Sequence, residues 1–477
     1  MENLGNRARQ GVSLVFYTKF ITQGIQFIFG LILARLLSPT DYGLVGMLAI
    51  FIALFEMLTD SGFGVAILQK KSPDSIDYST VFWFNFVFSL FLYLVLFFSA
   101  PAISSFYNNN KLIPILRALG VVSVLNAFGS VQGKYLNKNL KYESLTKVYM
   151  VAFISSSAFA VIFAYLGFGV WSLVLKSLVL ALLLNLGWWL ISSWKPQFKF
   201  SLKSLKQLFG FGSKILGVSI FETLFNNLYS LVIGKYFDAQ SLGYYTRAKQ
   251  FNDLPDTTFR GSAMEILFPV LSHIQDDDEK LVSIYKKAIS LFAFVLFPLY
   301  AILGVIAYPM IEVILTSKWI FSAEYVQILC IMSVTLPFQS INGNVLYVKG
   351  KSNYVLYITI IRRIIFLGLV LGLIKYGVVA LVWGIVIDAF IITILYIIFA
   401  AKVFTYRFID QIRDVLPVFL ITATSFLLMF VTKSFIVGSL KQLFIIPIIG
   451  LSVYILLSFF FRRNDIKEVL NLIKFKK

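Results

Sequence analysis

Two carboxylates lie inside an apolar stretch of this sequence. Glu56 and Asp60 stand in FEMLTDSGFGVAILQKK, residues 55–71, with hydrophobic residues on both sides. Residues four apart share a helix face, and a charge at the centre of a membrane costs at least about 2.5–3.5 kcal/mol. We therefore interpret the pair as an ion or proton coupling site, in which one carboxylate exchanges protons with a water-filled cavity. The structural alternative is that Lys19, at a similar depth in the preceding stretch, neutralises one acid.

Basic residues within apolar stretches are candidates for binding an anionic group. These are Lys19, Lys176 and Arg260. Arg260 lies in FRGSAMEILFP, where small neighbours leave space beside it, and an arginine fork matches the oxygens of a pyrophosphate. The alternative for Arg260 is an ion pair with Glu265 or with an acid of the other half of the chain. The alternative for Lys176 is pairing with a local partner.

Two further acids fall in later apolar stretches. Glu222 is followed by Asn226 and Asn227, and Asp388 lies in a run that is otherwise apolar. A lone acid within a membrane span usually has a functional role. We predict that both belong to a cation or proton site in the second half of the chain.

The composition predicts an integral membrane protein. Of 477 residues, 59% are hydrophobic and only 14% are charged, and the mean hydropathy is +0.84. The net charge of +19 is spread between apolar runs, which disfavours nucleic acid as a partner. One cysteine and one histidine exclude a disulfide framework and a Cys/His metal cluster. With no G-x-x-x-x-G-K-[ST] motif either, we expect no cofactor.

The apolar runs predict an all-α, polytopic fold of about fourteen membrane-spanning helices. The predicted spans lie near residues 12–34, 43–66, 80–104, 112–133, 147–166, 170–194, 211–234, 250–272, 287–308, 322–346, 355–375, 378–401, 415–432 and 443–461. If the first span starts inside, the inner segments hold about three times as many Lys and Arg residues as the outer ones, which predicts two cytoplasmic termini. We interpret Arg362 and Arg363 as inner-surface anchors.

A faint internal repeat relates the two halves. ARLLSPTDYGL at 34–44 aligns with GKYFDAQSLGY at 234–244, so that Gly43 matches Gly243 and position 60 corresponds to position 260. An even number of spans between the copies makes the repeat parallel, as in many transporters. The alternative is chance similarity between two loops.

The repeat and the breaks in hydropathy predict four parts. They are an N-terminal lobe (1–194), a cytoplasmic linker with a surface helix (195–210), a C-terminal lobe (211–401), and two further spans with a basic cytoplasmic tail (402–477). The glycines that follow Asp60 are expected to loosen the end of their helix, and Pro269 to kink another.

Four motifs together resemble a known family. LARLLSPTDYGLVGML, DSGFGVAILQKK, GFGVWSLV and LGYYTRAKQFNDLP are similar to segments of the Wzx-type oligosaccharide flippases, of the multidrug, oligolipid and polysaccharide exporter superfamily. The resemblance implies two six-helix lobes in a V around a central cavity, with two added C-terminal helices. It also implies a non-enzymatic role, the movement of undecaprenyl-pyrophosphate-linked oligosaccharide from the inner to the outer leaflet of the bacterial cytoplasmic membrane. Lys19 and Arg260 resemble in location the cationic residues that line the cavity in some relatives.

We expect a mechanism of alternating access, in which the lobes rock against each other and the movement is coupled to Na⁺ or H⁺. Membrane lipids are expected to surround the protein. One alternative is a cation-coupled multidrug or small-molecule antiporter of the same superfamily, which favours an acidic, aromatic cavity. The other is a membrane glycosyltransferase or polymerase, which requires a catalytic histidine or paired acids near an interface. The only histidine is His273, and the predicted outer loops are short.

Overall fold

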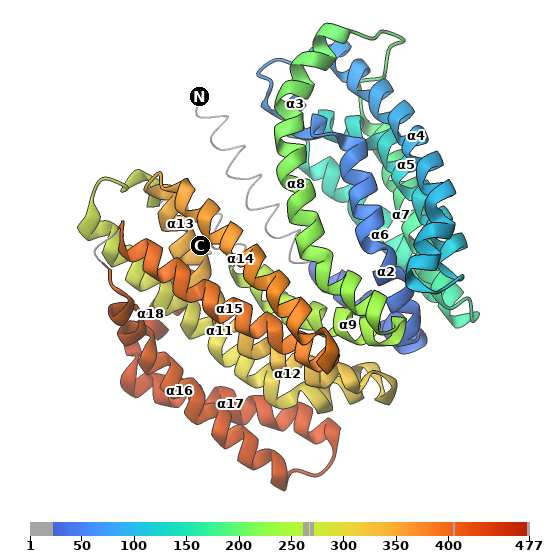
Figure 1. Cartoon of the computed structure of the whole chain (residues 1–477). Helices are drawn as coiled ribbons and strands as arrows, with labels where there is room; N and C mark the ends of the chain where they lie inside the picture. The colour runs from blue at the N-terminus through green and yellow to red at the C-terminus, as the bar shows by residue number, and fades with distance from the viewer. Residues whose placement is uncertain (1–21, 261–266, 268–270, 404–405, 475–477) are drawn as a thin grey trace. The chain divides into compact units, whose positions relative to one another are not determined.

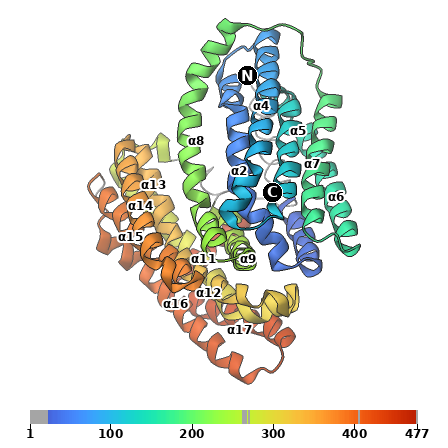
Figure 2. The ribbon, with the colours of Figure 1, turned by 45° about the vertical axis from the view of Figure 1, so that its right-hand side comes forward.

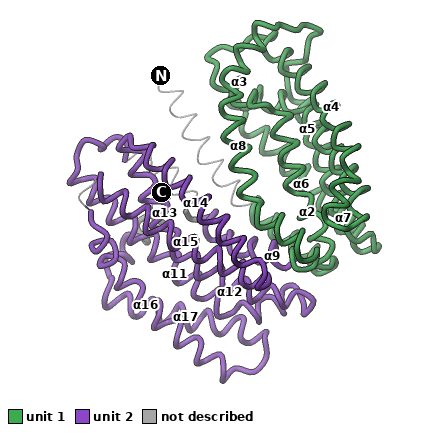
Figure 3. The backbone as a smooth tube through the Cα atoms, viewed as in Figure 1, with its two compact units in different colours: residues 1–243 green, residues 244–477 purple. Residues whose placement is uncertain are grey.

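The computed structural model describes residues 22–260, 267, 271–403 and 406–474, and every regular element within these ranges is helical (Figure 1 and Figure 2). Packing divides the chain into two compact units, residues 1–243 and 244–477, which Figure 3 colours separately.

The helices of the described residues fit a multi-pass membrane protein. Eleven are long and apolar enough to cross a membrane, or twelve if the bent pair α12 (Phe321–Ser333) and α13 (Leu336–Val348) forms one span. They match twelve of the predicted spans and confirm the all-α polytopic fold. The other two predicted spans, near 12–34 and 250–272, run partly through residues outside the described ranges.

Unit 1 is a bundle around the predicted acidic segment. Its helices are Thr22–Leu36, α2 (Pro39–Asp60), α3 (Phe63–Gln69), α4 (Ser75–Tyr107), α5 (Leu112–Lys138), α6 (Tyr142–Tyr165), α7 (Val170–Ile191) and α8 (Leu202–Tyr236). Helix α5 packs against α2, α4 and α7, and α8 packs against α2, α3 and α4. Phe63, Tyr78, Phe82 and Trp194 form a buried aromatic core where α3 and α4 meet the segment before α8.

Helix α2, which carries Glu56 and Asp60, has a defined start and end. Ser38 and Asp41 form a reciprocal capping box. Pro39 stands at the first helical position, where a backbone N–H would have no partner within the helix and proline has none. The helix stops where Ser61 (φ 46°) and Gly62 (φ 75°) adopt the left-handed conformation. The predicted loosening is therefore confirmed at Gly62, whereas Gly64 lies within α3 and Pro269 lies outside the described residues.

The segment before α8 differs from the predicted surface helix. Residues 202–209 are the first turns of the 35-residue helix α8, which continues into the predicted span. The preceding segment is bound to the start of α4, because Trp194 Nε1 donates to Ser75 Oγ (3.2 Å) and the Gln197 amide donates to Ser79 Oγ (3.0 Å). The packing division falls after Gly243, later than the linker at 195–210. The lobe boundaries remain a prediction.

The repeat corresponds to similar local structure in its two copies. Helix α2 begins at Pro39 and α9 (Ala239–Pro255) begins at Ala239, each after a short break. The Asp41 amide donates to Ser38 Oγ (3.2 Å), and the Ser241 amide donates to Asp238 Oδ1 (2.6 Å). Equivalent positions therefore cap the two helix starts.

The matched glycines lie in a reciprocal backbone contact. A Cβ on Gly43 would lie 1.6 Å from the carbonyl oxygen of Ala239, and a Cβ on Gly243 would lie 1.9 Å from that of Pro39. Each helix start thus crosses the other at the same repeat position, where any side chain would collide with backbone. This symmetry supports the repeat over chance similarity.

Unit 2 is organised around one long buried helix. Besides most of α9, it contains α11 (Asp278–Leu315), α12, α13, α14 (Ser352–Leu373), α15 (Val378–Ala401), α16 (Phe408–Phe435), α17 (Ser439–Phe461) and α18 (Arg463–Lys474). Helix α11 packs against α12, α13, α16 and α17. The basic tail forms the helix α18, and its Glu468 pairs with Lys287 of α11 (2.7 Å). Its cytoplasmic location remains a prediction.

Candidate functional site

Polar side chains from α2, α4 and α5 line a cavity of about 200 Å³ inside unit 1. The lining residues are Glu56, Thr59, Asp60, Asn85, Ser123, Asn126, Ala127 and Ser130. The lining residues of α2 share one face of that helix, and so do those of α5, because positions three, four and seven apart lie above one another in an α-helix. Helix α4 contributes Asn85 alone. The structure therefore brings both predicted acids into one pocket.

The two carboxylates make few contacts within this pocket. Asn126 donates its side-chain amide to Glu56 Oε1 (3.1 Å), and the Gly64 amide donates to Asp60 Oδ2 (3.3 Å). The Thr59 hydroxyl donates to its own helix, to the carbonyl of Phe55 (2.9 Å). Glu56 is exposed and Asp60 half-buried, so Glu56 stands at the mouth of the pocket.

Two neutral oxygens on the pocket wall lack hydrogen-bond partners among the described residues. They are Asn85 Oδ1 and Ser123 Oγ, and both residues are only 1% exposed. A buried polar atom without a partner costs about 1–3 kcal/mol, so such atoms are rare in native proteins. Neither residue was predicted as part of a site.

Lys134 is the basic residue that the described part of unit 1 brings beside Asp60. A Cβ on Gly64 would lie 2.8 Å from Asp60 Oδ1 and 2.9 Å from Lys134 Nζ, so the missing side chain leaves the space that both groups use. The sequence interpretation assigned the neutralising role to Lys19, which lies outside the described residues.

A second charged site lies in unit 2, near the middle of α14 and α15. Arg362 Nε donates to Asp388 Oδ2 at 3.1 Å, while Asp388 Oδ1 has no partner among the described residues. The carboxylate side chain is 2% exposed and that of Arg362 is 40% exposed. The interpretation of Arg362 as a surface anchor is therefore wrong, because the residue lies at mid-helix and pairs with a buried acid.

The remaining predicted site residues are dispersed. The ammonium of Lys176 lies 4.8 Å from the ring centroid of Phe153 on α6, which agrees with the local alternative. Glu222 is exposed on α8 of unit 1, whereas Asp388 belongs to unit 2, so the predicted two-acid site falls in separate units. The side chain of Arg260 lies outside the described part of the chain.

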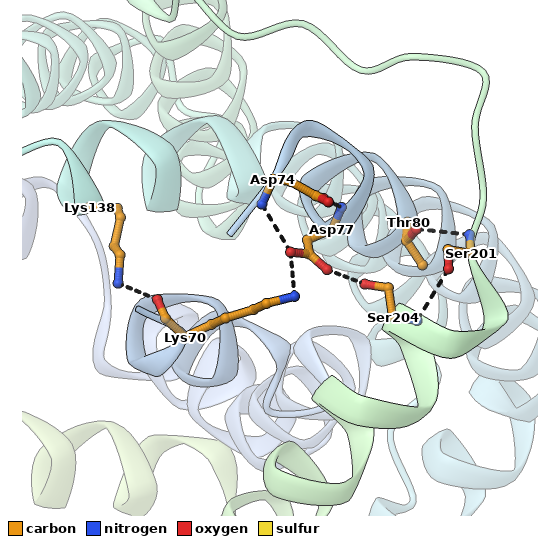
Figure 4. Close-up of polar contacts among 7 residues, drawn as sticks. All are labelled: Lys70, Asp74, Asp77, Thr80, Lys138, Ser201 and Ser204. Carbon is orange, nitrogen blue, oxygen red and sulfur yellow. Dashed lines mark hydrogen bonds and ion pairs between the residues drawn. The ribbon is translucent and has the colours of Figure 1, made fainter. Parts of the chain in front are cut away.

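A buried polar network at one end of unit 1 was not predicted (Figure 4). Asp77, at 2% exposure, accepts hydrogen bonds from Lys70 Nζ (2.6 Å), the Asp74 amide (3.0 Å) and the Ser204 hydroxyl. Lys138 donates to the carbonyl of Lys70 (2.6 Å). The network thus ties the segment after α3 to the starts of α4 and α8.

Replacing Asp77 with Ala is expected to destabilise unit 1 by about 2 kcal/mol, because the half-buried Lys70 loses its counter-charge and the buried Ser204 hydroxyl loses its acceptor. We expect the apparent melting temperature of the purified protein to fall clearly. The matched control is Glu143→Ala, which breaks the exposed pair of Glu143 with Lys147 (2.6 Å) and should cost at most about 0.5 kcal/mol. Equal melting temperatures for the two variants would contradict the structural role of Asp77.

The amino-acid sequence matches the model of a family described as "Polysaccharide biosynthesis protein" over residues 32–324. It is 24% identical to the teichuronic acid biosynthesis protein TuaB of Bacillus subtilis, over 63% of this chain and 63% of TuaB. It is 26% identical to the succinoglycan biosynthesis transport protein ExoT of Rhizobium meliloti, over 63% of this chain and 61% of ExoT. The lipopolysaccharide biosynthesis protein WzxC of Escherichia coli is 24% identical over 76% of this chain and 75% of WzxC. The alignments span less than two thirds of TuaB and ExoT.

Solved structures with the same fold include two transport proteins. The lipid II flippase MurJ, in its inward closed conformation, aligns with a TM-score of 0.74 at 19% identity, over 95% of this chain and 100% of MurJ. An inward-facing multidrug resistance transporter of the MATE family aligns with a TM-score of 0.63 at 17% identity, over 79% of this chain and 94% of the transporter. At these identities, the likeness concerns the fold alone.

Proposed function

Because this chain belongs to the polysaccharide biosynthesis protein family, we propose that it moves undecaprenyl-pyrophosphate-linked oligosaccharide from the inner to the outer leaflet of the bacterial cytoplasmic membrane. The family match agrees with the Wzx-type motifs of the sequence. The multi-pass helical fold, which MurJ and MATE transporters share, supports transport rather than catalysis.

The observation that carries this proposal is the partly exposed side chain of Arg362 at the middle of α14. A charge at this depth is costly in contact with acyl chains, so the exposed 40% of the side chain should face water or an anionic ligand. Asp388 binds Nε and orients the side chain, while the guanidinium fork suits phosphate oxygens. A lipid pyrophosphate meets both requirements.

The predicted substrate contacts Lys19 and Arg260 remain part of the proposal on the strength of the motif resemblance. Lys176 is a weaker candidate, because its ammonium lies against Phe153. For Asp388 we now favour a positioning role over ion binding, because it already pairs with an internal cation. Coupling to an ion gradient is assigned to the pocket of Glu56 and Asp60, with Glu222 as a further acid. Both termini are proposed to be cytoplasmic.

A gene deletion tests the proposed function in cells. We expect lipid-linked oligosaccharide to accumulate on the inner leaflet and the surface polysaccharide to disappear, because the substrate no longer crosses the membrane. Mass spectrometry of extracted lipids and staining of surface polymer measure the two effects, and a plasmid copy of the gene should reverse both. Unchanged lipid levels would favour the antiporter alternative, which the acidic pocket of unit 1 also suits.

A further inference from the structure

We infer that residues 195–203, which connect α7 to the first turn of α8, bind the headgroups of anionic phospholipids at the membrane surface. The segment reads KPQFKFSLK, so that polar and apolar residues alternate along it, with a lysine at every fourth position. This contact with the surrounding lipid goes beyond the proposed function and does not depend on the transported substrate.

The apolar side chains of the segment are the first argument. Phe198 is 94% exposed, Leu202 is 65% exposed and Phe200 is 50% exposed. Residues 192–201 are not helical, and backbone without regular hydrogen bonds is not tolerated in contact with acyl chains. The segment therefore belongs outside the hydrocarbon core. Apolar side chains in that position are removed from water when they enter the lipid from the headgroup layer.

The charges of the segment are the second argument. Lys195, Lys199 and Lys203 are all exposed, and the sequence contains no acidic residue between positions 144 and 221. Asp77, which lies near the start of α8, is buried and already pairs with Lys70 (2.6 Å). Basic residues next to an anionic membrane surface are attracted to it. A surface rich in lipid phosphates therefore complements this segment in charge.

Tryptophans hold the segment in place. Trp83 Nε1 donates to the carbonyl of Gln197 (2.8 Å), and its ring stacks on Phe198 with the centroids 5.0 Å apart. The Lys195 ammonium donates to the carbonyl of Trp189 and lies 5.0 Å from the centroid of its ring. Tryptophan is enriched at the level of the lipid headgroups. The lysines are thus carried by a fixed segment at the depth where headgroup phosphates are found.

Photo-crosslinking of the purified full-length protein tests the inference. The protein is placed in phosphatidylcholine bilayers that contain either a photoreactive phosphatidylglycerol or the matching phosphatidylcholine probe, and labelled peptides are quantified by mass spectrometry. We expect the phosphatidylglycerol probe to label peptides that contain residues 195–203 in clear excess over the phosphatidylcholine probe. Added salt should lower this excess, because it screens exposed charges.

Charge variants show whether the lysines cause the excess. The triple variant Lys195→Gln, Lys199→Gln and Lys203→Gln should lower labelling by phosphatidylglycerol at least about tenfold, whereas arginine at the same positions should retain it. The matched control replaces Lys147, Lys249 and Lys280 with Gln. It removes the same charge, but each of these lysines pairs with an acid of its own (2.6, 2.8 and 2.7 Å), so labelling should stay unchanged.

A variant of the aromatic part tests the contact with the acyl region. Phe198→Ser should lower labelling of the segment by both probes, because the side chain that enters the lipid is lost.

Two results would overturn the site: equal labelling of the segment by both probes in the wild-type protein, or wild-type labelling in the glutamine triple variant. Displacement of the phosphatidylglycerol probe by inorganic phosphate would show a site for soluble anions and would overturn the lipid as its occupant. Normal labelling of a protein that moves no lipid-linked oligosaccharide would count against the proposed function alone.

Discussion

The double variant Arg362→Met with Asp388→Leu is expected to reach the membrane in normal amounts and to export no surface polysaccharide. Together the substitutions remove the ion pair (3.1 Å) without leaving a buried charge, a change that is often neutral for stability. If Arg362 binds the substrate phosphate, export is lost although the fold is kept. Surface polymer and membrane-bound protein are quantified in the same cells.

The single variants and a second pair complete this test. Arg362→Met alone should lower both export and stability, because it leaves Asp388 buried and unpaired. The control double variant Lys287→Met with Glu468→Leu removes a more exposed pair (2.7 Å) of the same unit and should retain export. Restored export in the Arg362/Asp388 double variant would assign the arginine a purely structural role.

The second large effect is expected at the reciprocal glycines. Gly43→Ala should reduce the amount of folded protein strongly, by a destabilisation of about 3 kcal/mol or more, because the new methyl group meets the Ala239 carbonyl at 1.6 Å. Backbone cannot rotate away as a side chain can. Gly243→Ala should act in the same way, and the two together should cost less than the sum, since either one already separates the helices. Fluorescence-detected size-exclusion chromatography measures the folded fraction.

Gly217→Ala is the control for these glycine variants. Gly217 lies in α8, and a Cβ added there would meet no neighbouring atom within 4 Å, so alanine should be neutral or slightly stabilising. Near-normal yields of both Gly43→Ala and Gly243→Ala would show that α2 and α9 do not cross as closely as described.

Most of the fold could be predicted because lipid imposes simple constraints on sequence. Apolar runs of sufficient length correspond to helices, and breaks such as Ser61 and Gly62 follow from glycine chemistry. The continuous helix α8 could not be predicted in the same way. The polar first turns of α8 have the sequence pattern of a surface helix. They are held by contacts such as that of Ser204 with Asp77, and because these residues are far apart in the sequence, the contact could not be predicted.

The site was predictable only where it carries charge. Glu56 and Asp60 are conspicuous in an apolar run, whereas neutral polar residues such as Asn85 also occur in other predicted spans, for example Asn185 and Asn342. A signal did exist in α5, where Ser123, Asn126 and Ser130 follow helical spacing and so mark one polar face.

The error at Arg362 has a different cause. Adjacent arginines resemble the basic ends of membrane spans. The predicted span near 355–375 already contained Arg362, and helix α14, which begins at Ser352, keeps it well inside. Only the pairing with Asp388, which belongs to the next helix, shows that the arginine has a partner inside the span.

Translocation by the purified full-length protein is the most direct test of the central claim. Undecaprenyl-pyrophosphate-linked oligosaccharide is incorporated into vesicles that contain the protein, and headgroups accessible from outside are followed with a membrane-impermeant glycosidase. We predict that headgroups from the inner leaflet become accessible in vesicles with this chain, and that the Arg362/Asp388 double variant shows no such increase. Accessibility equal to that of protein-free vesicles would contradict the account.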